Sequence, residues 1–423
     1  MNAFIDKLNL VFRDSGLRKR VLFIFGALAI FRLLTHIPIP GIDVVRLQTL
    51  FEGSQFLGLL NLFSGGGLSN LSIVMLGVGP YITASIIMQL LTIMVPKLKA
   101  MYQEEGEAGR ARFGQYSRRL TLPLALLQGF SFLILLERQG VVSTLTPFDF
   151  IVNVIVVTAG SVFLMWLGEL MSEFGIGNGT SLIIFSGIVA SLPRTITNLI
   201  AAYDPSQIPL YLGFAAVAVA VIYAVVVVTE AERPIPVTYA KQVRGMKVYG
   251  GISTYLPLRV NQAGVIPIIF SLSMLLFPQM IFNFLSSATN PTLKMISSTG
   301  LSIINNPWIY DSAYFLLVFA FTYFYTAITF DPVMISDNLQ KSGAFVPGVR
   351  PGQPTAEHLS KIVTRITLVG ASFLGFIAVL PLLMRSVTGI TTLALGGTAM
   401  LIAVSVVLDL VKKIDAQLSM REY

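Results

Sequence analysis

Very few residues of this chain could carry out covalent or metal chemistry. The sequence has no cysteine and only two histidines, His36 and His358, which argues against a thiol site and against a histidine-built metal centre. The glycine clusters at 65–67 and 396–397 lack the lysine that a phosphate-binding loop requires. The apolar segments hold no pairing of a nucleophile with a base. These residues therefore argue against an enzyme, and against a chain that hydrolyses nucleotides itself.

Six ionisable residues lie in or beside long apolar runs. A charge inside a membrane is a functional hypothesis by default, but a long side chain within a turn or two of a span end can reach the headgroups. Arg32 is the exception among the six. No series of acidic residues crosses the middle of the predicted membrane, which argues against a proton-coupled pump. The six are Arg32, Glu169, Glu173, Glu230, Asp331 and Asp409.

The composition is that of a polytopic membrane protein. Of 423 residues, 54% are hydrophobic and 12% are charged, whereas soluble domains carry about twice that charge. The mean hydropathy is +0.77. Basic residues precede an apolar run from Val21, as in a signal peptide. That run ends in THIPIPG without a small-residue cleavage site, so we expect a retained first span.

Hydropathy predicts ten membrane spans. The segments at 181–200 and 366–384 are the least regular, because both contain glycine and lie beside proline. The predicted spans are 21–37, 73–95, 120–137, 151–171, 181–200, 210–230, 263–284, 313–331, 366–384 and 391–411.

The distribution of lysine and arginine predicts the orientation. With the N-terminus in the cytoplasm, 23 of the 29 basic residues fall in inside segments, as the positive-inside rule requires. Both termini are then cytoplasmic, and the number of spans is even. The remaining six lie in or beyond the outer ends of spans: Arg32, Arg46, Arg138, Arg194, Lys294 and Arg385.

Ten spans divide into two halves of five, 1–200 and 201–423. Because five is odd, the halves run in opposite directions through the membrane. If they are structural repeats, they form an inverted repeat about an axis in the membrane plane, although the sequence shows no convincing internal identity. The predicted fold class is thus an all-α polytopic membrane protein with ten transmembrane helices in two inverted five-helix halves.

The stretch 56–96 is too long and too broken for one helix. It is apolar over about forty residues, roughly twice the length of one crossing, and it contains Ser64, Gly65–Gly67, Gly77, Gly79 and Pro80. We expect a short re-entrant piece at about 61–71, followed by a full span at 73–95. Irregular backbone at membrane depth must be buried in protein or line a watery cavity. This stretch therefore predicts a cavity.

Three cytoplasmic loops are long, at 96–119, 231–262 and 332–365. Such loops are often only solvated topology determinants. The second and third also carry apolar and aromatic residues, which suggests an ordered docking surface, and their basic charge would attract ribosomal RNA or an acidic protein. The residues in question are Val237, Tyr239, Val248, Tyr249, Phe345 and Val346.

Several long motifs, in order on this frame, resemble the SecY/Sec61-alpha family, whose bacterial members are the channel-forming subunits of the Sec protein translocase. The resemblance implies two five-helix halves around an hourglass pore, a hydrophobic constriction, a short plug helix and a lateral gate toward lipid. The stretches that carry it are FRLLTHIPIPGID (31–43), LFSGGGLSNLSI (62–73), GPYITASIIMQLL (79–91), MWLGELMSEFGIGNGTSLIIFSGIVA (165–190), VNQAGVIPIIF (260–270) and SGAFVPGVRPG (342–352).

The function implied by this resemblance is a passive protein-conducting channel of the bacterial plasma membrane. It would translocate unfolded secretory polypeptides and release membrane-protein segments laterally into lipid, without a cofactor. The implied partners are the SecE and SecG subunits, the SecA motor ATPase, the ribosome with its nascent chain, signal sequences and membrane lipid.

The resemblance also implies a plug, which would leave its site during transport. We therefore expect it to pack weakly, with three glycines providing little side-chain area and a flexible hinge. Without the resemblance, the same residues could form an interfacial loop. The plug comprises Asn61, Leu62, Phe63, Ser64, Gly65, Gly66, Gly67, Leu68, Ser69 and Asn70.

The constriction implied by the resemblance is a ring of aliphatic side chains. Positions 78 and 82, like 184 and 188, are four apart and share a helix face. Aliphatic side chains disfavour water and ions in a narrow pore, although an isoleucine in a span usually faces lipid or core. The ring comprises Val78, Ile82, Ile184, Ile188, Ile269 and Ile402.

The resemblance places a lateral gate at Thr83, Gln128 and Asn261, where polar bonds would hold two walls together; three separate helix-packing bonds are the alternative. It also assigns partner docking to Arg350, in GVRPG. Further basic residues of the other docking loop are Arg233, Lys241, Arg244 and Lys247.

A secondary transporter with inverted repeats is the competing function. Transporters bind substrate through polar or charged groups near the midplane. This sequence instead places aliphatic residues there and enlarges its cytoplasmic loops, which favours the channel.

Overall fold

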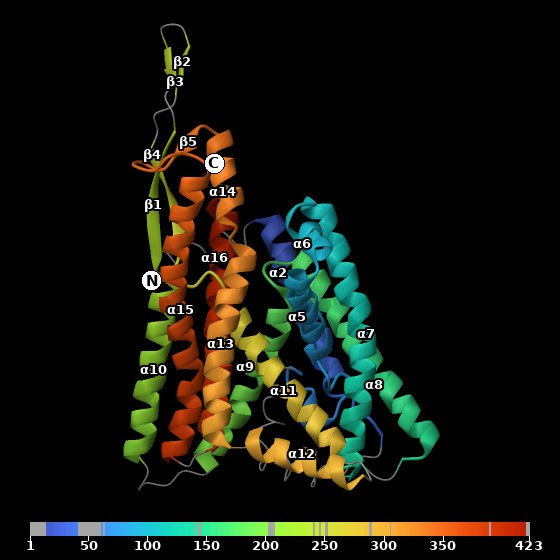
Figure 1. Ribbon diagram of the computed structural model, residues 1–423. Coiled ribbons are helices and arrows are strands. Elements are labelled where there is room, and N and C mark those ends of the chain that lie inside the picture. The colour runs from blue at the N-terminus through green and yellow to red at the C-terminus, as the bar shows by residue number, and fades with distance from the viewer. Residues whose placement is uncertain are drawn as a thin grey trace. The chain divides into compact units, whose positions relative to one another are not determined.

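The protein is mostly helical (Figure 1). The computed structural model describes residues 14–40, 61, 64–138, 140–142, 145–201, 208–239, 242–244, 247–249, 253–286, 290–304, 306–388 and 391–419. Each of the ten predicted spans overlaps a helix. The helices are α2 (Ser15–Leu34), α5 (Gly79–Met94), α6 (Pro96–Gln103), α7 (Gly106–Arg138), α8 (Pro147–Phe174), α9 (Gly179–Ala201), α10 (Ile208–Glu230), α11 (Ile266–Leu285), α12 (Pro291–Ile304), α13 (Pro307–Thr329), α14 (Pro332–Lys341), α15 (Gln353–Thr388) and α16 (Thr391–Ser419).

Several helices are long and apolar enough to cross a membrane, so the chain is a multi-pass membrane protein. Within the described residues, four helical stretches meet both criteria, or five if α5 and α6 form one span across their 111° bend. The four are Gly106–Glu137, Pro147–Phe174, Pro307–Lys341 and Gln353–Met384.

Short polar caps explain where several helices begin. The carboxylate of Asp14 accepts hydrogen bonds from the backbone N–H groups of Gly16 (2.7 Å) and Leu17 (3.2 Å) at the start of α2. Asp331 does the same for Val333 (2.9 Å) and Met334 (3.2 Å) at the start of α14. Such caps satisfy N–H groups that lack a partner within the helix. Asp331 therefore has a structural role at a helix end.

The predicted span at 73–95 differs from the structure. Residues 73–78 form turns, and α5 starts only at Gly79. Gly77 has a φ of +58°, a conformation that glycine adopts without strain. Pro80 follows in the first turn of α5, where a missing backbone N–H costs nothing. The glycine–proline break thus shortens the helix to 16 residues.

Chain contacts divide the protein into two compact units. The first comprises Met1–Ile208, Leu272–Pro307 and Gly389–Tyr423. The second comprises Pro209–Ser271 and Trp308–Thr388. In the first unit, α7 packs against both α5 and α8, and α9 packs against α8 and α16.

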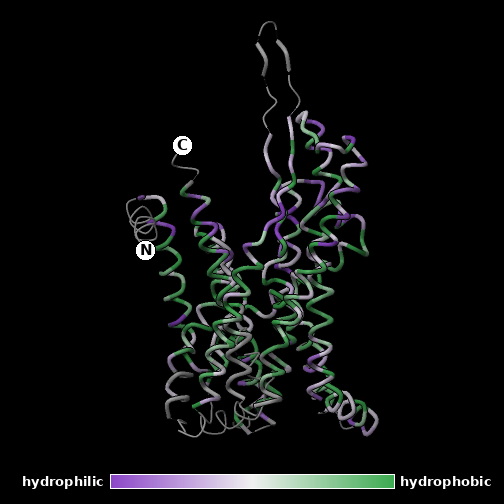
Figure 2. The backbone as a smooth tube through the Cα atoms, turned by 90° about the vertical axis from the view of Figure 1, so that its left-hand side faces the viewer, coloured by the Kyte–Doolittle hydropathy of each residue, from purple (hydrophilic) through white to green (hydrophobic). Residues whose placement is uncertain are grey.

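The second unit contains β-strands, so the all-α prediction was wrong for this part of the chain. Strands β4 (Ser253–Arg259), β1 (Glu232–Tyr239) and β5 (Ala344–Phe345) form one antiparallel sheet in that order. Strands β2 (Gln242–Arg244) and β3 (Lys247–Tyr249) form a separate hairpin. Hydrophilic residues gather around these strands, whereas the helices are largely hydrophobic (Figure 2).

Alternation along β1 explains why this loop forms a strand. Ile235 and Val237 are buried, whereas Pro234 and Pro236 are exposed, as expected for side chains that point to opposite faces of a sheet. Two prolines so close together also prevent a helix. Strand β5 pairs only with the end of β1, at Thr238 and Tyr239. The prolines therefore lie where β1 has one open edge, which is where a sheet tolerates them.

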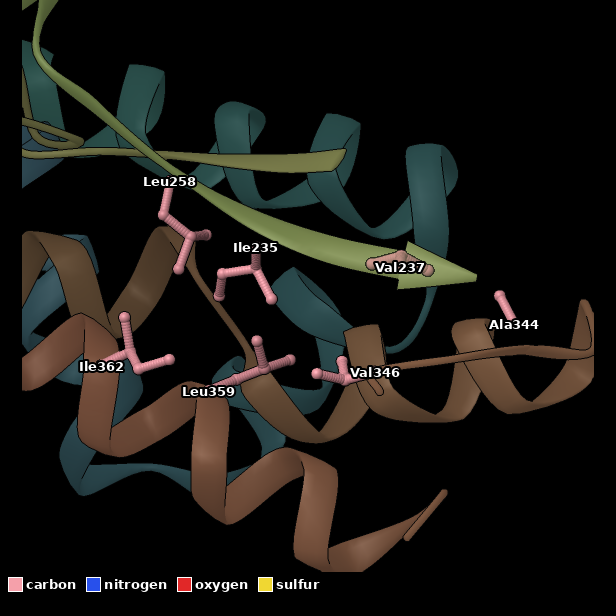
Figure 3. Packing of buried hydrophobic residues seen from close by; sticks show 7 residues of the cluster. All are labelled: Ile235, Val237, Leu258, Ala344, Val346, Leu359 and Ile362. Carbon is pink, nitrogen blue, oxygen red and sulfur yellow. The ribbon is translucent and has the colours of Figure 1, made fainter. Parts of the chain in front are cut away.

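One apolar cluster joins the two predicted docking loops into a single folded element (Figure 3). Strands β1 and β4 contribute three side chains, the β5 region contributes two, and α15 contributes two. Because residues from 231–262 and 332–365 share this core, the loops are ordered together. The cluster is Ile235, Val237, Leu258, Ala344, Val346, Leu359 and Ile362.

Shortening Leu359 to alanine should loosen this element. Leu359 is fully buried among the cluster residues, and a buried Leu→Ala substitution costs about 2–5 kcal/mol. We expect proteolysis within 231–262 to become at least about 30-fold faster. Leu368→Ala on the same helix is the matched control, because Leu368 is 52% exposed. Equal cleavage rates in the two variants would contradict the shared core.

Candidate functional site

Residues 64–78, which precede α5, belong to the first unit and are largely buried. Ser64 and Leu68 are 1% and 2% exposed, and Leu71, Ser72 and Val74 are fully buried. Within residues 64–78, Leu68–Asn70 form a 3₁₀ turn, and Ser72 forms an isolated β-bridge with Pro38. Over 64–71, the predicted re-entrant piece is therefore a largely buried loop, with Asn70 exposed. Leu62 and Phe63 of the predicted plug lie outside the described residues.

Hydrogen bonds from side chains hold this loop in shape. The amide oxygen of Asn61 accepts from the backbone N–H of Ser69 (2.9 Å). The hydroxyl of Ser64 accepts from the N–H of Leu68 (3.0 Å), and that of Ser72 donates to the carbonyl of Gly67 (2.9 Å). Buried backbone groups need such partners, so the polar residues of the motif let the loop exist in an apolar interior.

The end of α2 and the residues after it also hold the segment. The amide of Asn70 donates to the carbonyl of Thr35 (3.1 Å). The backbone N–H of Ile39 donates to the carbonyl of Leu71 (2.9 Å), and that of Ile73 donates to the carbonyl of Ile37 (3.0 Å). The hydroxyl of Ser161, on α8, donates to the carbonyl of Gly77 (2.8 Å) beyond it.

Glycines allow the segment to approach α9 closely. A Cβ on Gly187 of α9 would lie 2.1 Å from the Cα of Gly65, so the two backbones touch. A Cβ on Gly65 would lie 2.5 Å from the ring of Phe31. Gly65 also has a φ of +64°, which disfavours any other residue.

These contacts correct the expectation of weak packing. Most of its described residues are buried, with Asn70 exposed, and the segment is hydrogen-bonded and in backbone contact with α9. Gly65 allows the close approach to α9, because it has no side chain. Sequence reasoning also missed Phe31 and Gly187 as partners of the segment, because no local pattern reveals which glycine of one helix meets a loop more than a hundred residues away.

All six residues of the predicted ring are buried. Ile188 directly follows Gly187, whose backbone contacts Gly65, and Ile184 lies one turn before it on α9. The backbone N–H of Ile82 donates to the carbonyl of Val78 (3.0 Å), one turn apart. Ile269 belongs to the second unit and the other five to the first. The exposed fractions are Val78 0%, Ile82 7%, Ile184 1%, Ile188 1%, Ile269 5% and Ile402 1%.

Two of the predicted gate residues, Thr83 and Asn261, donate hydrogen bonds to nearby backbone carbonyls. The hydroxyl of Thr83 donates to the carbonyl of Gly79 in its own helix (3.0 Å). The amide of Asn261 donates to the carbonyl of Gly264 (3.3 Å), and its oxygen is buried without a hydrogen bond in the described structure. Gln128 is 8% exposed on α7, which packs against α5.

Arg350 lies on an exposed turn whose backbone is fixed. Gly348 and Gly352 both have positive φ values, +83° and +90°. The hydroxyl of Thr355 donates to the carbonyl of Arg350 (2.7 Å), and that of Ser336 donates to the carbonyl of Gly352 (2.7 Å). The turn therefore presents the arginine side chain to solvent.

The other predicted docking residues differ in their exposure and in their surroundings. Arg233 is exposed on β1. Arg244 and Lys247 are paired positions of the β2–β3 hairpin, and Lys241 lies outside the described residues. Val237 and Val346 are buried in the shared cluster. Those two valines hold the element together and do not form its surface.

Glu169 and Asp409 have ionic partners. Glu169 accepts from Arg118 across α7 and α8 (2.7 Å), and Asp409 accepts from Lys413 one turn on (2.6 Å). Neither is an unpaired charge, so neither indicates an ion pathway.

Known proteins are similar to this sequence over its whole length. The SecY family model matches residues 72–411. The chain is 40% identical to the protein translocase subunit SecY of Mycobacterium tuberculosis (strain ATCC 25618 / H37Rv), over 100% of this chain and 99% of that protein. The chain belongs to the SecY family. Its identity to the SecY subunit of Streptomyces coelicolor is 42%, over 97% of each chain.

Solved SecY-family structures share the fold. A structure described as a protein conducting channel matches with a TM-score of 0.66 at 18% identity, over 96% of this chain and 93% of the other. Sec61 in the canine ribosome-channel complex matches with a TM-score of 0.62 at 18% identity, over the same shares. The SecY fold thus extends over nearly all of the chain.

Proposed function

We propose that this protein is a passive protein-conducting channel, the SecY subunit of a bacterial translocase. It translocates unfolded secretory polypeptides across the plasma membrane and releases membrane-protein segments laterally into lipid. The observation that carries this function is the full-length identity of about 40% to translocase subunits. The chain is not an enzyme, and a partner supplies the energy. Family membership also decides against the secondary transporter.

The proposed membrane topology has ten spans in two inverted halves, 1–200 and 201–423, with both termini in the cytoplasm. Its support is the overlap of every predicted span with a helix and the placement of 23 of 29 basic residues in inside segments.

The proposed closed state has two layers. Residues 61–70 form the plug, and the six buried aliphatic residues form the ring that excludes water. Supporting this assignment, Gly65 contacts α9 at Gly187, beside ring residue Ile188. The lateral gate comprises Thr83, Gln128 and Asn261. Among the described residues, the buried oxygen of Asn261 has no hydrogen bond, so it can accept one from a gate partner.

The proposed partners are SecE, SecG, the SecA motor, the ribosome with its nascent chain, and signal sequences. The likeness to Sec61 in a ribosome-channel complex supports the ribosome as one of them. The ordered element around β1, β5 and α14, with Arg233 and Arg350 exposed, supplies a cationic surface suited to carboxylates or phosphates.

Reconstitution tests the function directly. The chain, with SecE and SecG in liposomes, should import a secretory precursor when SecA and ATP are added, and only when the precursor has a signal sequence. Failure of import, together with uptake of a small solute, would favour the transporter.

Reversing the charge of Arg350 to glutamate should reduce SecA-driven import by about tenfold or more, because a lost interfacial charge pair costs about 2–5 kcal/mol. The protein should still fold, since the side chain of Arg350 is exposed and only its carbonyl holds the turn. Lys294→Glu, an exposed charge reversal on α12, is the matched control. Normal import by the Arg350 variant would refute the docking assignment.

A further inference from the structure

Arg32 is a charged residue of the apolar segments to which the proposed channel assigns no role. It lies in the last turn of α2 and is half-buried. Its two terminal nitrogens donate to backbone carbonyls from different parts of the chain. One bond goes to Gly65 (3.3 Å), in the plug, and the other to Ser186, on α9. Within the described part of the chain, no carboxylate forms an ion pair with it.

An arginine at a helix end commonly serves that helix, because its charge complements the carbonyl end of the dipole. Here other groups do this work. The hydroxyl of Thr35 donates to the carbonyl of Arg32 (2.8 Å), and Nδ1 of His36 lies 2.8 Å from the same oxygen. The N–H of Thr35 donates to the carbonyl of Phe31 (3.1 Å). The Arg32 side chain is thus directed at the plug and α9.

The shape of the guanidinium suits a bridge between two carbonyls. It is planar and permanently charged and holds several donors in a rigid fork, whereas a lysine ammonium is a point charge on a flexible stem. Gly65 is held from a second side by the ring of Phe31 and from a third by Gly187. The consecutive residues Phe31 and Arg32 therefore hold one plug residue against α9.

We propose that Arg32 is a positioning residue that latches the plug in the closed channel. This rests on the proposed function, because it takes residues 61–70 to be the plug. Departure of the plug breaks the bond to Gly65 and leaves the bond to Ser186. The water that enters the vacated site then solvates the freed donor, so the latch can open and close reversibly.

Losing the latch should raise the fraction of displaced plug roughly ten- to hundredfold, the factor expected for one hydrogen bond to a charged group. The chain has no cysteine, so a single Leu68→Cys change gives a clean probe. Leu68 is 2% exposed, and labelling there requires the plug to move. The experiment uses the full translocase in liposomes, a water-soluble maleimide and a parallel measurement of ion leak.

Three variants in the Leu68→Cys background decide the matter. Arg32→Gln should raise both labelling rate and leak, and should relax the requirement for a signal sequence. Arg32→Lys should give a smaller rise, because one ammonium cannot bridge both carbonyls. Arg118→Gln removes another interhelical arginine, paired with Glu169 (2.7 Å), and should leave both readouts at the parent values.

Deleting 61–70 separates failure of the latch from failure of the channel assignment. If the deletion raises leak while both Arg32 variants match the parent, the latch is overturned and the plug stands. If the deletion leaves leak unchanged, the plug assignment is overturned and the latch with it. Equal rises in Arg32→Gln and Arg118→Gln would indicate general loosening and overturn the latch. Should Arg32→Gln fail to insert, Arg32→Lys decides: labelling at the parent rate overturns the proposal.

Discussion

Replacing Gly187 with alanine should displace the plug and leave the channel leaky without substrate. The added Cβ would lie 2.1 Å from the Cα of Gly65 and 2.4 Å from its carbonyl carbon. Both are backbone atoms, which cannot rotate away as a side chain would. Such overpacking costs about 1–3 kcal/mol, and moving the plug is the direct way to relieve it.

We expect ion leak through reconstituted channels to rise about ten- to hundredfold, with relaxed dependence on the signal sequence. Gly26→Ala on α2 is the matched control, because a Cβ there meets no heavy atom within 4 Å. The measurement is conductance of the translocase in planar bilayers before any precursor is added. A Gly187→Ala channel as tight as the Gly26→Ala channel would show that this contact does not belong to the closed state.

Replacing Ile402 with asparagine should also loosen the closed channel. Ile402 is 1% exposed on α16, so the new amide would enter an apolar environment. An unpaired buried polar group costs about 1–3 kcal/mol, and hydration of the ring would relieve that cost. The closed state should lose stability relative to the open one, with ion leak rising at least about tenfold and weak signal sequences becoming effective.

Ile402→Val separates polarity from packing, because it removes one methylene and typically costs about 0.5–1.5 kcal/mol. We expect that variant to retain signal-sequence selectivity. If the asparagine and valine channels show the same leak and selectivity as the parent, Ile402 does not belong to the ring.

The sequence was most informative where the argument depended on composition and order along the chain. A long apolar chain with little charge indicates a multi-pass membrane protein. Its spans are helical, because backbone groups in lipid must find their hydrogen bonds within the protein. The motifs around the 65–67 glycines, the 165–190 stretch and GVRPG identified the SecY family, which the full-length relatives confirm.

Local sequence was less reliable for the ends of helices and for the presence of strands. The span beginning at 73 was placed six residues too early, since hydropathy does not distinguish buried turns from helix. The 231–262 loop was recognised as ordered but its strands were missed, because Val237 and Val346 could equally have formed a surface. Their burial depends on Leu359, more than a hundred residues beyond β1.

The apolar chemistry of this protein and its lack of catalytic groups follow from the sequence by itself, because they depend only on which residues are present. The polar contacts of Arg32 with Gly65 and Ser186, and the backbone contact of Gly65 with Gly187, were decided by the tertiary structure. The sequence cannot show which carbonyl accepts a hydrogen bond, because every residue has a carbonyl. It also cannot show which glycine makes a close contact, because every glycine lacks a side chain. Only the packing of α2, α9 and the loop determines which of them meet.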